Sequence, residues 1–161
     1  MNKTKKICLL ILTLLITLTL TGCKTIDNLS SITLECTREY YDTNNYKTID
    51  KQTIKARNQY VTYIKSETLY EVEPDFLVNA LEFGDSLANS LQNCNGVSLK
   101  YEKYDDKTLK ITTKVDYELV NENELKNALG ELYSETDPLL SGKKVELNKY
   151  KTVTLNEYTC K

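Results

Sequence analysis

The cysteines are the residues of this 161-residue chain with the clearest capacity for chemistry, because the sequence contains five of them and no histidine. The absence of histidine excludes Ser-His-Asp and Cys-His catalysis and most zinc sites. In such a chain a thiol can be acylated, oxidised to a disulfide or buried as a small apolar group. The surroundings of each cysteine indicate which of these applies.

Cys23 stands at the end of a segment with the composition of an export signal. Three lysines among residues 3–6 precede an apolar run over residues 7–20, and the small pair Thr21-Gly22 precedes the cysteine. A positively charged start, an apolar segment and small residues before a cleavage site are the parts of a bacterial export signal. The alternative, an uncleaved membrane anchor, requires about 20 apolar residues, which is more than this run supplies.

The four residues Leu20-Thr21-Gly22-Cys23 resemble a lipobox, the motif read by bacterial lipoprotein signal peptidase. The resemblance implies cleavage before Cys23 and attachment of diacylglycerol to its sulfur. We therefore expect residues 1–22 to be a lipoprotein signal peptide, and residues 23–30 to be a short tether. Two or more acyl chains hold a protein stably on a bilayer, which predicts an extracytoplasmic protein anchored to the bacterial cell membrane.

The charge of the chain supports a lipid rather than a basic patch as the membrane contact. Residues 1–22 contain three lysines and no acidic residue, so their removal changes the formal net charge from −2 to −5. Anionic headgroups repel an acidic protein. The same balance disfavours nucleic acid as a partner, because nucleic-acid binding depends on contacts of lysine and arginine with phosphates.

Three cysteines remain after Cys23, and export would place them in a compartment where disulfides persist. Cys36, Cys94 and Cys160 allow three pairings. We favour Cys36–Cys160, which joins the first predicted strand to the carboxyl end, and a disulfide that closes so long a loop contributes on the order of 4 to 5 kcal/mol in the chain-entropy model. The alternative is three free, buried thiols.

Alternating apolar and polar residues predict strands over residues 31–41, 97–101 and 109–115. The last two, joined by a turn at residues 105–107, form the clearest hairpin. Residues 46–65 also have strand composition, and the pattern does not decide between one bent strand and a hairpin.

Apolar residues at helical spacing predict a helix that begins at Pro74 and ends near Leu91. Asn121 followed by Glu124 has the spacing of a capping box and predicts a second helix, which ends near Tyr133. In residues 145–160 the helix and strand signals are mixed. The fold expected from these elements is an α+β domain over residues 31–161, with an antiparallel sheet of about four strands and two or three helices packed on one face.

Acidic side chains are the remaining candidates for catalysis or cation binding. They cluster at Glu71, Glu73 and Asp75 before the first helix, and at Asp105 and Asp106 in the hairpin turn. Carboxylates at such positions are usually caps and turn formers, and neither cluster has the spacing of a calcium loop. We therefore expect no catalytic residue, no metal site and no cofactor.

Lys100, Lys110 and Lys114 fall on the polar face of the predicted hairpin. This stripe is a possible contact surface in an otherwise acidic protein. The alternative is a solvated face of the sheet, which is the usual role of such residues.

The strongest local likeness to a known family lies in three segments, Asn95-Gly96-Val97-Ser98-Leu99-Lys100-Tyr101, Leu109-Lys110-Ile111-Thr112 and Val115-Asp116-Tyr117. The order of elements and the closing Tyr158-Thr159-Cys160 are also similar. In these respects the chain resembles the small YehR-like bacterial lipoproteins. The resemblance implies an α+β domain that ends in a helix, and it implies no activity.

These observations predict a binding or interaction module held near the cell envelope, without catalytic activity. Its partner would be an envelope protein or a cell-wall component. The alternative is a lipoprotein that captures a small molecule or an ion. This second function requires an enclosed pocket, usually of about 300 Å³ or more.

Overall fold

The computed structural model of the chain describes residues 31–161. The expected signal peptide (residues 1–22), the lipobox residues Leu20, Thr21, Gly22 and Cys23, and the tether (residues 23–30) lie outside the described residues. None of the helices described is long and apolar enough to cross a membrane.

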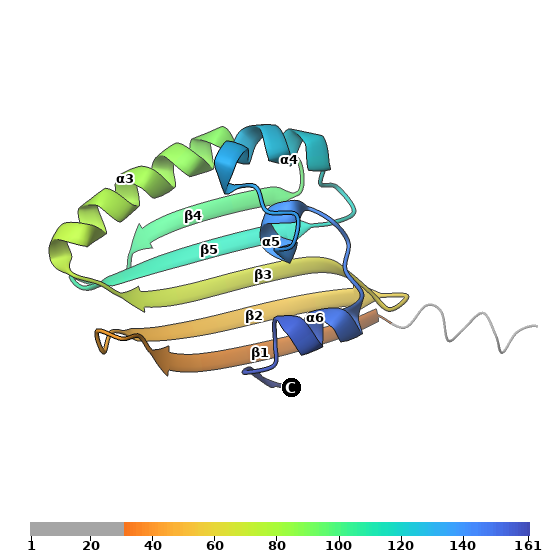
Figure 1. Cartoon of the computed structure of the whole chain (residues 1–161), viewed down its shortest axis with the longest axis horizontal. Helices are drawn as coiled ribbons and strands as arrows, with labels where there is room; N and C mark the ends of the chain where they lie inside the picture. The colour runs from red at the N-terminus through yellow and green to blue at the C-terminus, as the bar shows by residue number, and fades with distance from the viewer. Residues whose placement is uncertain (1–30) are drawn as a thin grey trace, which may run out of the picture. The chain divides into compact units, whose positions relative to one another are not determined.

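A six-stranded antiparallel sheet in the order β4-β5-β3-β2-β1-β6 forms the frame of the described chain (Figure 1). Its strands are β1 (Ser31–Tyr41), β2 (Lys47–Arg57), β3 (Tyr60–Glu71), β4 (Val97–Lys103), β5 (Thr108–Asp116) and β6 (Thr159–Cys160). The first three strands follow one another in the chain and lie side by side, and β5 joins the β4–β5 hairpin to β3.

Helices make up less of the domain than the sheet. They are α3 (Pro74–Ser90), α4 (Glu122–Leu129), the 3₁₀ turn η2 (Gly130–Leu132), α5 (Pro138–Ser141) and α6 (Leu147–Val153). The expected helix from Pro74 is therefore confirmed as α3. The second predicted helix is shorter than expected, because the α-helix ends at Leu129 and η2 follows; its Asn121 side chain accepts hydrogen bonds from the backbone amides of Asn123 and Glu124.

The expectation of about four strands with two or three helices packed on one face is wrong. The described chain is mostly β, with six strands and several helices of only one or two turns. One source of the error is the segment 46–65, which forms two long strands. Asn58 and Gln59 both have positive φ, as a two-residue type I′ hairpin turn requires. Asparagine favours this conformation, but glutamine gives no such signal.

The carboxyl-terminal segment explains a second part of the difference. It forms α6 and then the two-residue strand β6, so the expected terminal helix exists only over Leu147–Val153. Strand β6 pairs with β1 through Cys36 opposite Cys160 and Thr37 opposite Thr159. The mixed signal in the sequence thus reflects a helix and a strand within one short segment.

The predicted disulfide between Cys36 and Cys160 is confirmed. The two Cα atoms are 4.0 Å apart, and the residues are separated by 124 positions in the chain. In the chain-entropy model a bond that closes so long a loop stabilises the fold by about 4 to 5 kcal/mol. Cys94 is free and buried, and burial raises the pKa of its thiol, so the thiol stays protonated and unreactive at neutral pH.

The inner face of the sheet, defined here as the face that carries Ile54, Ile64 and Val115, packs against the helices. These three side chains are fully buried and belong to one apolar cluster with Leu147 and Tyr150 of α6. A second cluster forms where α3 meets the sheet, and a third lies among α3, α4 and β4. Helix α6 therefore covers one region of this face, and α3 and α4 cover another.

Helix α3 approaches β4 closely at Gly84. A Cβ atom on this glycine would lie 2.1 Å from Cγ of Tyr101 on β4. The ring of Tyr101 is also met edge-on by the ring of Phe83, with 6.5 Å between the ring centroids. Because no larger side chain fits against this ring, Gly84 sets the distance between the helix and the strand.

We expect Gly84→Ala to destabilise the protein by about 1 to 3 kcal/mol, the usual cost of overpacking a filled site. Alanine is otherwise the better helix former, so a destabilising effect would report the clash alone. Urea unfolding monitored by circular dichroism would measure the change. The matched control is the same substitution in a Tyr101→Ala background, where the added methyl group should cost little. An equal cost in both backgrounds would contradict the contact.

Candidate functional site

The lysines of the predicted contact surface lie on the outer face of the sheet, opposite the buried residues Leu109 and Val115 of β5. Lys100 Nζ is 2.7 Å from Glu102 Oε1, and Lys110 Nζ is 3.6 Å from Glu67 Oε1. Lys114 forms no ion pair within residues 31–161. Neighbouring carboxylates therefore balance much of the charge that the sequence placed here.

The acidic candidates take part in turns and strand ends. Asp105 Oδ1 accepts a hydrogen bond of 2.8 Å from the backbone amide of Lys107 within the β4–β5 turn. Glu71 Oε2 accepts one of 2.9 Å from the amide of Lys47 at the start of β2. Residues 31–161 contain no group of three or more cysteine, aspartate or glutamate side chains placed to hold a metal ion.

Strand β2 carries an unexpected row of polar side chains on the inner face. Thr48, Asp50 and Gln52 are 1, 7 and 6 % exposed, and they share this face with the apolar residues Ile54 and Ala56. A buried polar side chain is costly unless it forms hydrogen bonds. Asp50 and Gln52 find such partners on neighbouring strands and on the segments that cover them, whereas the hydroxyl of Thr48 has none within residues 31–161.

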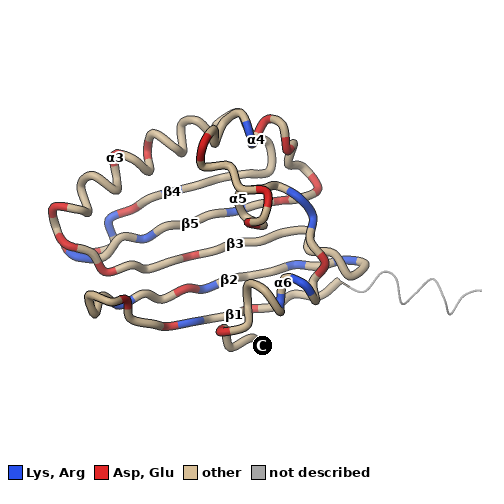
Figure 2. The backbone as a smooth tube through the Cα atoms, viewed as in Figure 1, with Lys and Arg blue, Asp and Glu red and all other residues tan. Residues whose placement is uncertain are grey.

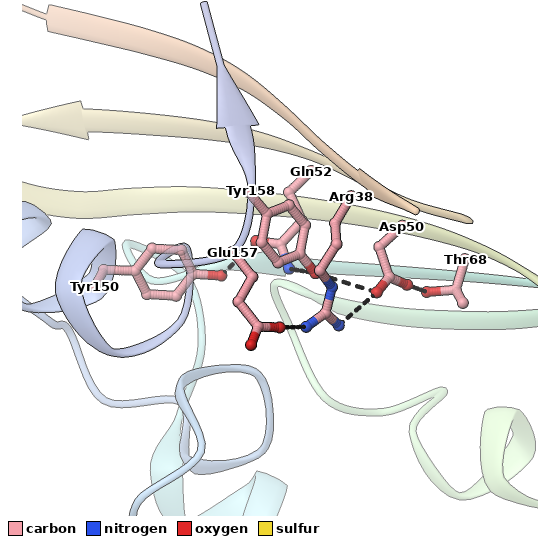
Figure 3. Close-up of polar contacts among 7 residues, drawn as sticks. All are labelled: Arg38, Asp50, Gln52, Thr68, Tyr150, Glu157 and Tyr158. Atoms are coloured by element: carbon pink, nitrogen blue, oxygen red, sulfur yellow. Dashed lines mark hydrogen bonds and ion pairs between the residues drawn. The ribbon is translucent and has the colours of Figure 1, made fainter. Parts of the chain in front are cut away.

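Asp50 is the centre of the resulting network (Figure 3). Its Oδ2 accepts a hydrogen bond of 2.8 Å from Arg38 Nη2 on β1 and one of 3.3 Å from the hydroxyl of Tyr158. Its Oδ1 accepts one of 2.8 Å from Thr68 Oγ1 on β3. One positive charge and two hydroxyls thus compensate for the loss of water around this carboxylate.

The guanidinium of Arg38 is held by aromatic rings as well as by acids. Its central carbon lies 4.5 Å from the ring centroid of Tyr40 and 4.8 Å from that of Tyr158. Arg38 Nη1 also donates a 3.0 Å hydrogen bond to Glu157 Oε2. Contact with two aromatic faces stabilises the charged guanidinium and fixes the orientation of its plane.

Gln52 extends the network to helix α6. Its Oε1 accepts a 2.7 Å hydrogen bond from the hydroxyl of Tyr150, and its Nε2 donates one of 3.3 Å to the hydroxyl of Tyr158. Figure 3 shows Tyr150 reaching from α6 and Tyr158 from the following segment toward the same strand. Directional bonds therefore fix both the helix and the tail on the sheet.

Burial changes the proton affinity of the tyrosines in this region. Burial, together with the nearby charge of Asp50, raises the pKa of Tyr158 to about 12. Burial also raises the pKa values of Tyr117 and Tyr150. Since tyrosine in an unfolded chain has a pKa of about 10, the folded protein holds these protons more tightly than the unfolded chain does.

We expect the stability of the protein to be fully present below about pH 10 and to fall as the pH rises toward 12, because the unfolded tyrosines ionise first. Urea unfolding midpoints between pH 8 and pH 11.5 would measure this fall. The variant Tyr158→Phe should show a smaller decrease of the midpoint with rising pH, because it lacks one of the tyrosines whose pKa is raised in the folded protein. A midpoint that stays constant over this range would contradict the assigned cause.

We expect Asp50→Ala to destabilise the protein by about 2 to 4 kcal/mol, because it leaves a partly buried arginine and two hydroxyls without their acceptor. The matched control is Glu157→Ala, which removes a carboxylate that is 67 % exposed from the same arginine. This exposed pair should change stability by less than about 1 kcal/mol. Equal effects of the two substitutions, measured by urea unfolding, would contradict a central role for Asp50.

A pocket of about 430 Å³ lies between α5 and α6, next to this network. Its wall includes Tyr150, whose hydroxyl is bound to Gln52. Lysine, serine and valine side chains also line it: Lys143, Lys144, Lys149, Ser141, Val145 and Val153. The volume falls within the range of about 300 to 1,000 Å³ that is usual for small-molecule sites.

Two other hollows are smaller, at about 200 Å³ each. One is lined mainly by leucines of α3, α4 and α5 and by side chains of β4 and β5. The other lies near Asp42, Tyr46, Tyr70 and Phe76, where the β1–β2 turn approaches the start of α3. The pocket between α5 and α6 is thus the best candidate for a binding site.

The side chains of this pocket and of the network were not predicted as functional residues from the sequence. A signal for the network exists in β2, where polar residues at positions 48, 50 and 52 continue into apolar residues at 54 and 56. The doublet Lys143-Lys144 followed by Lys149 is a signal for the pocket. Neither pattern shows by itself which side chains meet in space.

The fold is similar to that of solved protein structures. No protein-family model matches the chain, and no curated protein matches it. An NMR structure of a protein from Streptococcus pneumoniae TIGR4 is similar to it, with a TM-score of 0.55 and 14 % identity, over 82 % of this chain and 86 % of that one. The NMR structure of the Escherichia coli YehR protein is similar with a TM-score of 0.53 and 16 % identity, over 82 % and 91 %. The chain therefore has a YehR-like fold, as its sequence suggested.

Proposed function

We propose that the chain is a lipid-anchored protein of the bacterial cell envelope whose folded domain binds a ligand and catalyses no reaction. The pocket between α5 and α6 is the observation that carries this proposal. It combines the volume of a small-molecule site with charged, hydroxyl and apolar side chains. Such a shape suits a small molecule or a short segment of a polymer better than the flat contact of two folded proteins.

The anchoring part of the proposal rests on the sequence. The lysines before the apolar run and the lipobox that ends at Cys23 favour export, cleavage and lipidation. The bond between Cys36 and Cys160 supports the same location, because disulfides of this kind form and persist outside the reducing cytoplasm.

The chemistry of the pocket favours binding over catalysis. A general base or nucleophile must lie within hydrogen-bond reach of its partner group. Here Lys143 is bound to carboxylates, with Nζ 3.2 Å from Glu122 Oε1 and 4.0 Å from Glu135 Oε2. The hydroxyl of Tyr150 is bound to Gln52, and its raised pKa keeps it protonated.

We expect the protein taken from its native membrane to have the mass of a chain that begins at Cys23 with added acyl groups. Alkylation after denaturation should label one thiol, Cys94, before reduction and three after it, because Cys36 and Cys160 form a disulfide. Intact mass spectrometry measures both results.

The control is Cys23→Ser, which should abolish the added lipid mass and release the protein from the membrane fraction. On intact cells, a membrane-impermeant amine reagent should modify the exposed lysines Lys144 and Lys149. A mass that matches all 161 residues, or retention of the Cys23→Ser variant in the membrane fraction, would contradict the proposed lipid anchor.

A further inference from the structure

The pocket between α5 and α6 is positively charged in a negatively charged domain. Residues 31–161 contain 17 basic and 22 acidic residues, a formal net charge of −5. The pocket wall holds three lysines and one acid, Glu135. Figure 2 shows basic positions on the loop that leads into α6 and again within α6. Local charge of this kind selects ligands of the opposite sign even where the whole domain would repel them.

Two of the three lysines are available to a ligand. Lys143 is engaged by Glu122 and Glu135, and its hydrogen bond to Glu122 raises its pKa. Lys144 and Lys149 are exposed and form no ion pair with any residue of the described part of the chain. Two ammonium groups thus stand at the pocket without a counter-charge.

A buried hydroxyl offers a further donor. Ser141 is 2 % exposed, and its Oγ accepts a 3.2 Å hydrogen bond from the backbone amide of Lys143. Among residues 31–161, its own proton has no acceptor. A phosphate or carboxylate group can accept hydrogen bonds from this hydroxyl and from the two ammonium groups. Hydrogen bonds between charged partners of this type are strong.

The rest of the wall is apolar. Pro138, Val145 and Val153 contribute to it, and Val153 is 68 % exposed although it is large and apolar. Covering such a side chain removes apolar surface from water, which is favourable. A purely ionic ligand would leave this part of the pocket unused.

We propose that this pocket binds an amphipathic anion, a molecule in which one phosphate or carboxylate group is joined to a short apolar body. The anionic group lies at Lys144, Lys149 and Ser141, and the apolar body covers Val145 and Val153. The inference rests on the proposed function, because it assigns the ligand class of the same pocket. A short-chain phospholipid and a soluble organic phosphate share this chemistry.

Titration of the full chain in a non-ionic detergent, followed by NMR of the backbone amides of Ser141, Val145 and Val153, tests the proposal. The probes are hexyl phosphate, 1-hexanol, inorganic phosphate and dihexanoylphosphatidylglycerol. We expect saturable shifts with hexyl phosphate and at least tenfold weaker binding of 1-hexanol and of inorganic phosphate, since each lacks one half of the ligand. If the phospholipid also binds, the natural ligand is a lipid. If the phospholipid does not bind, the natural ligand is a soluble organic anion. Either result supports the ligand class.

Variants separate the ligand class from the site. The double variant Lys144→Ala/Lys149→Ala should weaken the binding of hexyl phosphate at least tenfold. The control Lys51→Ala/Lys107→Ala removes two exposed lysines elsewhere and should leave the affinity unchanged. Equal affinities for hexyl phosphate and 1-hexanol, both insensitive to the lysine variants, would overturn the anionic class but leave a binding pocket. No shift with any probe would overturn the pocket as a binding site, and the proposed function with it.

Discussion

The covalent bond between Cys36 and Cys160 is the constraint on which the arrangement of the carboxyl-terminal segment depends. It holds β6 against the middle of β1, and so brings Glu157 and Tyr158 over Arg38. The segment that precedes them is α6, which supplies one wall of the pocket. A bond at the edge of the sheet thus holds the end of this segment, while backbone hydrogen bonds from Val61 to Val145 and from Leu147 to Gln59 hold its start.

The polar network adds direction to this covalent link. The apolar cluster that contains Leu147 and Tyr150 of α6 together with Ile54 of β2 favours burial but tolerates small displacements. The hydrogen bonds from Tyr150 to Gln52 and from Tyr158 to Asp50 permit one position. Replacing a whole buried ion pair by well-packed apolar residues is often neutral for stability, although removing one partner alone is costly, so we interpret the network as a device for positional specificity.

Much of the fold follows from local pattern. The alternation of apolar residues located β1, β4 and β5, and proline with a helical apolar stripe located α3. The disulfide could be chosen because one cysteine stood in a strand and another at the carboxyl end. The type I′ turn at Asn58 and Gln59 carried too weak a signal to separate β2 from β3, and a segment with both helical and strand residues did not reveal α6 and β6.

The pocket and the network could not be read in the same way, because both depend on long-range contacts. Arg38 meets Glu157 across 119 positions of the sequence, and Tyr150 meets Gln52 across 98. Periodicity assigns a side chain to a face of its own strand, but it does not say what covers that face. Asp50 and Gln52 fit a solvated strand face as well as a buried one until the position of the tail is known.

The short length of β6 and its position against β1 affect the tendency of the domain to pair edge to edge with other copies of itself. Strand β1 spans Ser31–Tyr41, and the tail pairs with it at Glu35, Cys36 and Thr37. Among the described residues, nothing pairs on this edge with the four residues on each side of the tail, 31–34 and 38–41. An open strand edge is a template for aggregation between copies, and native proteins protect such edges by covering or interrupting them. The tail divides the longest free edge into two pieces, each too short to hold an added strand firmly.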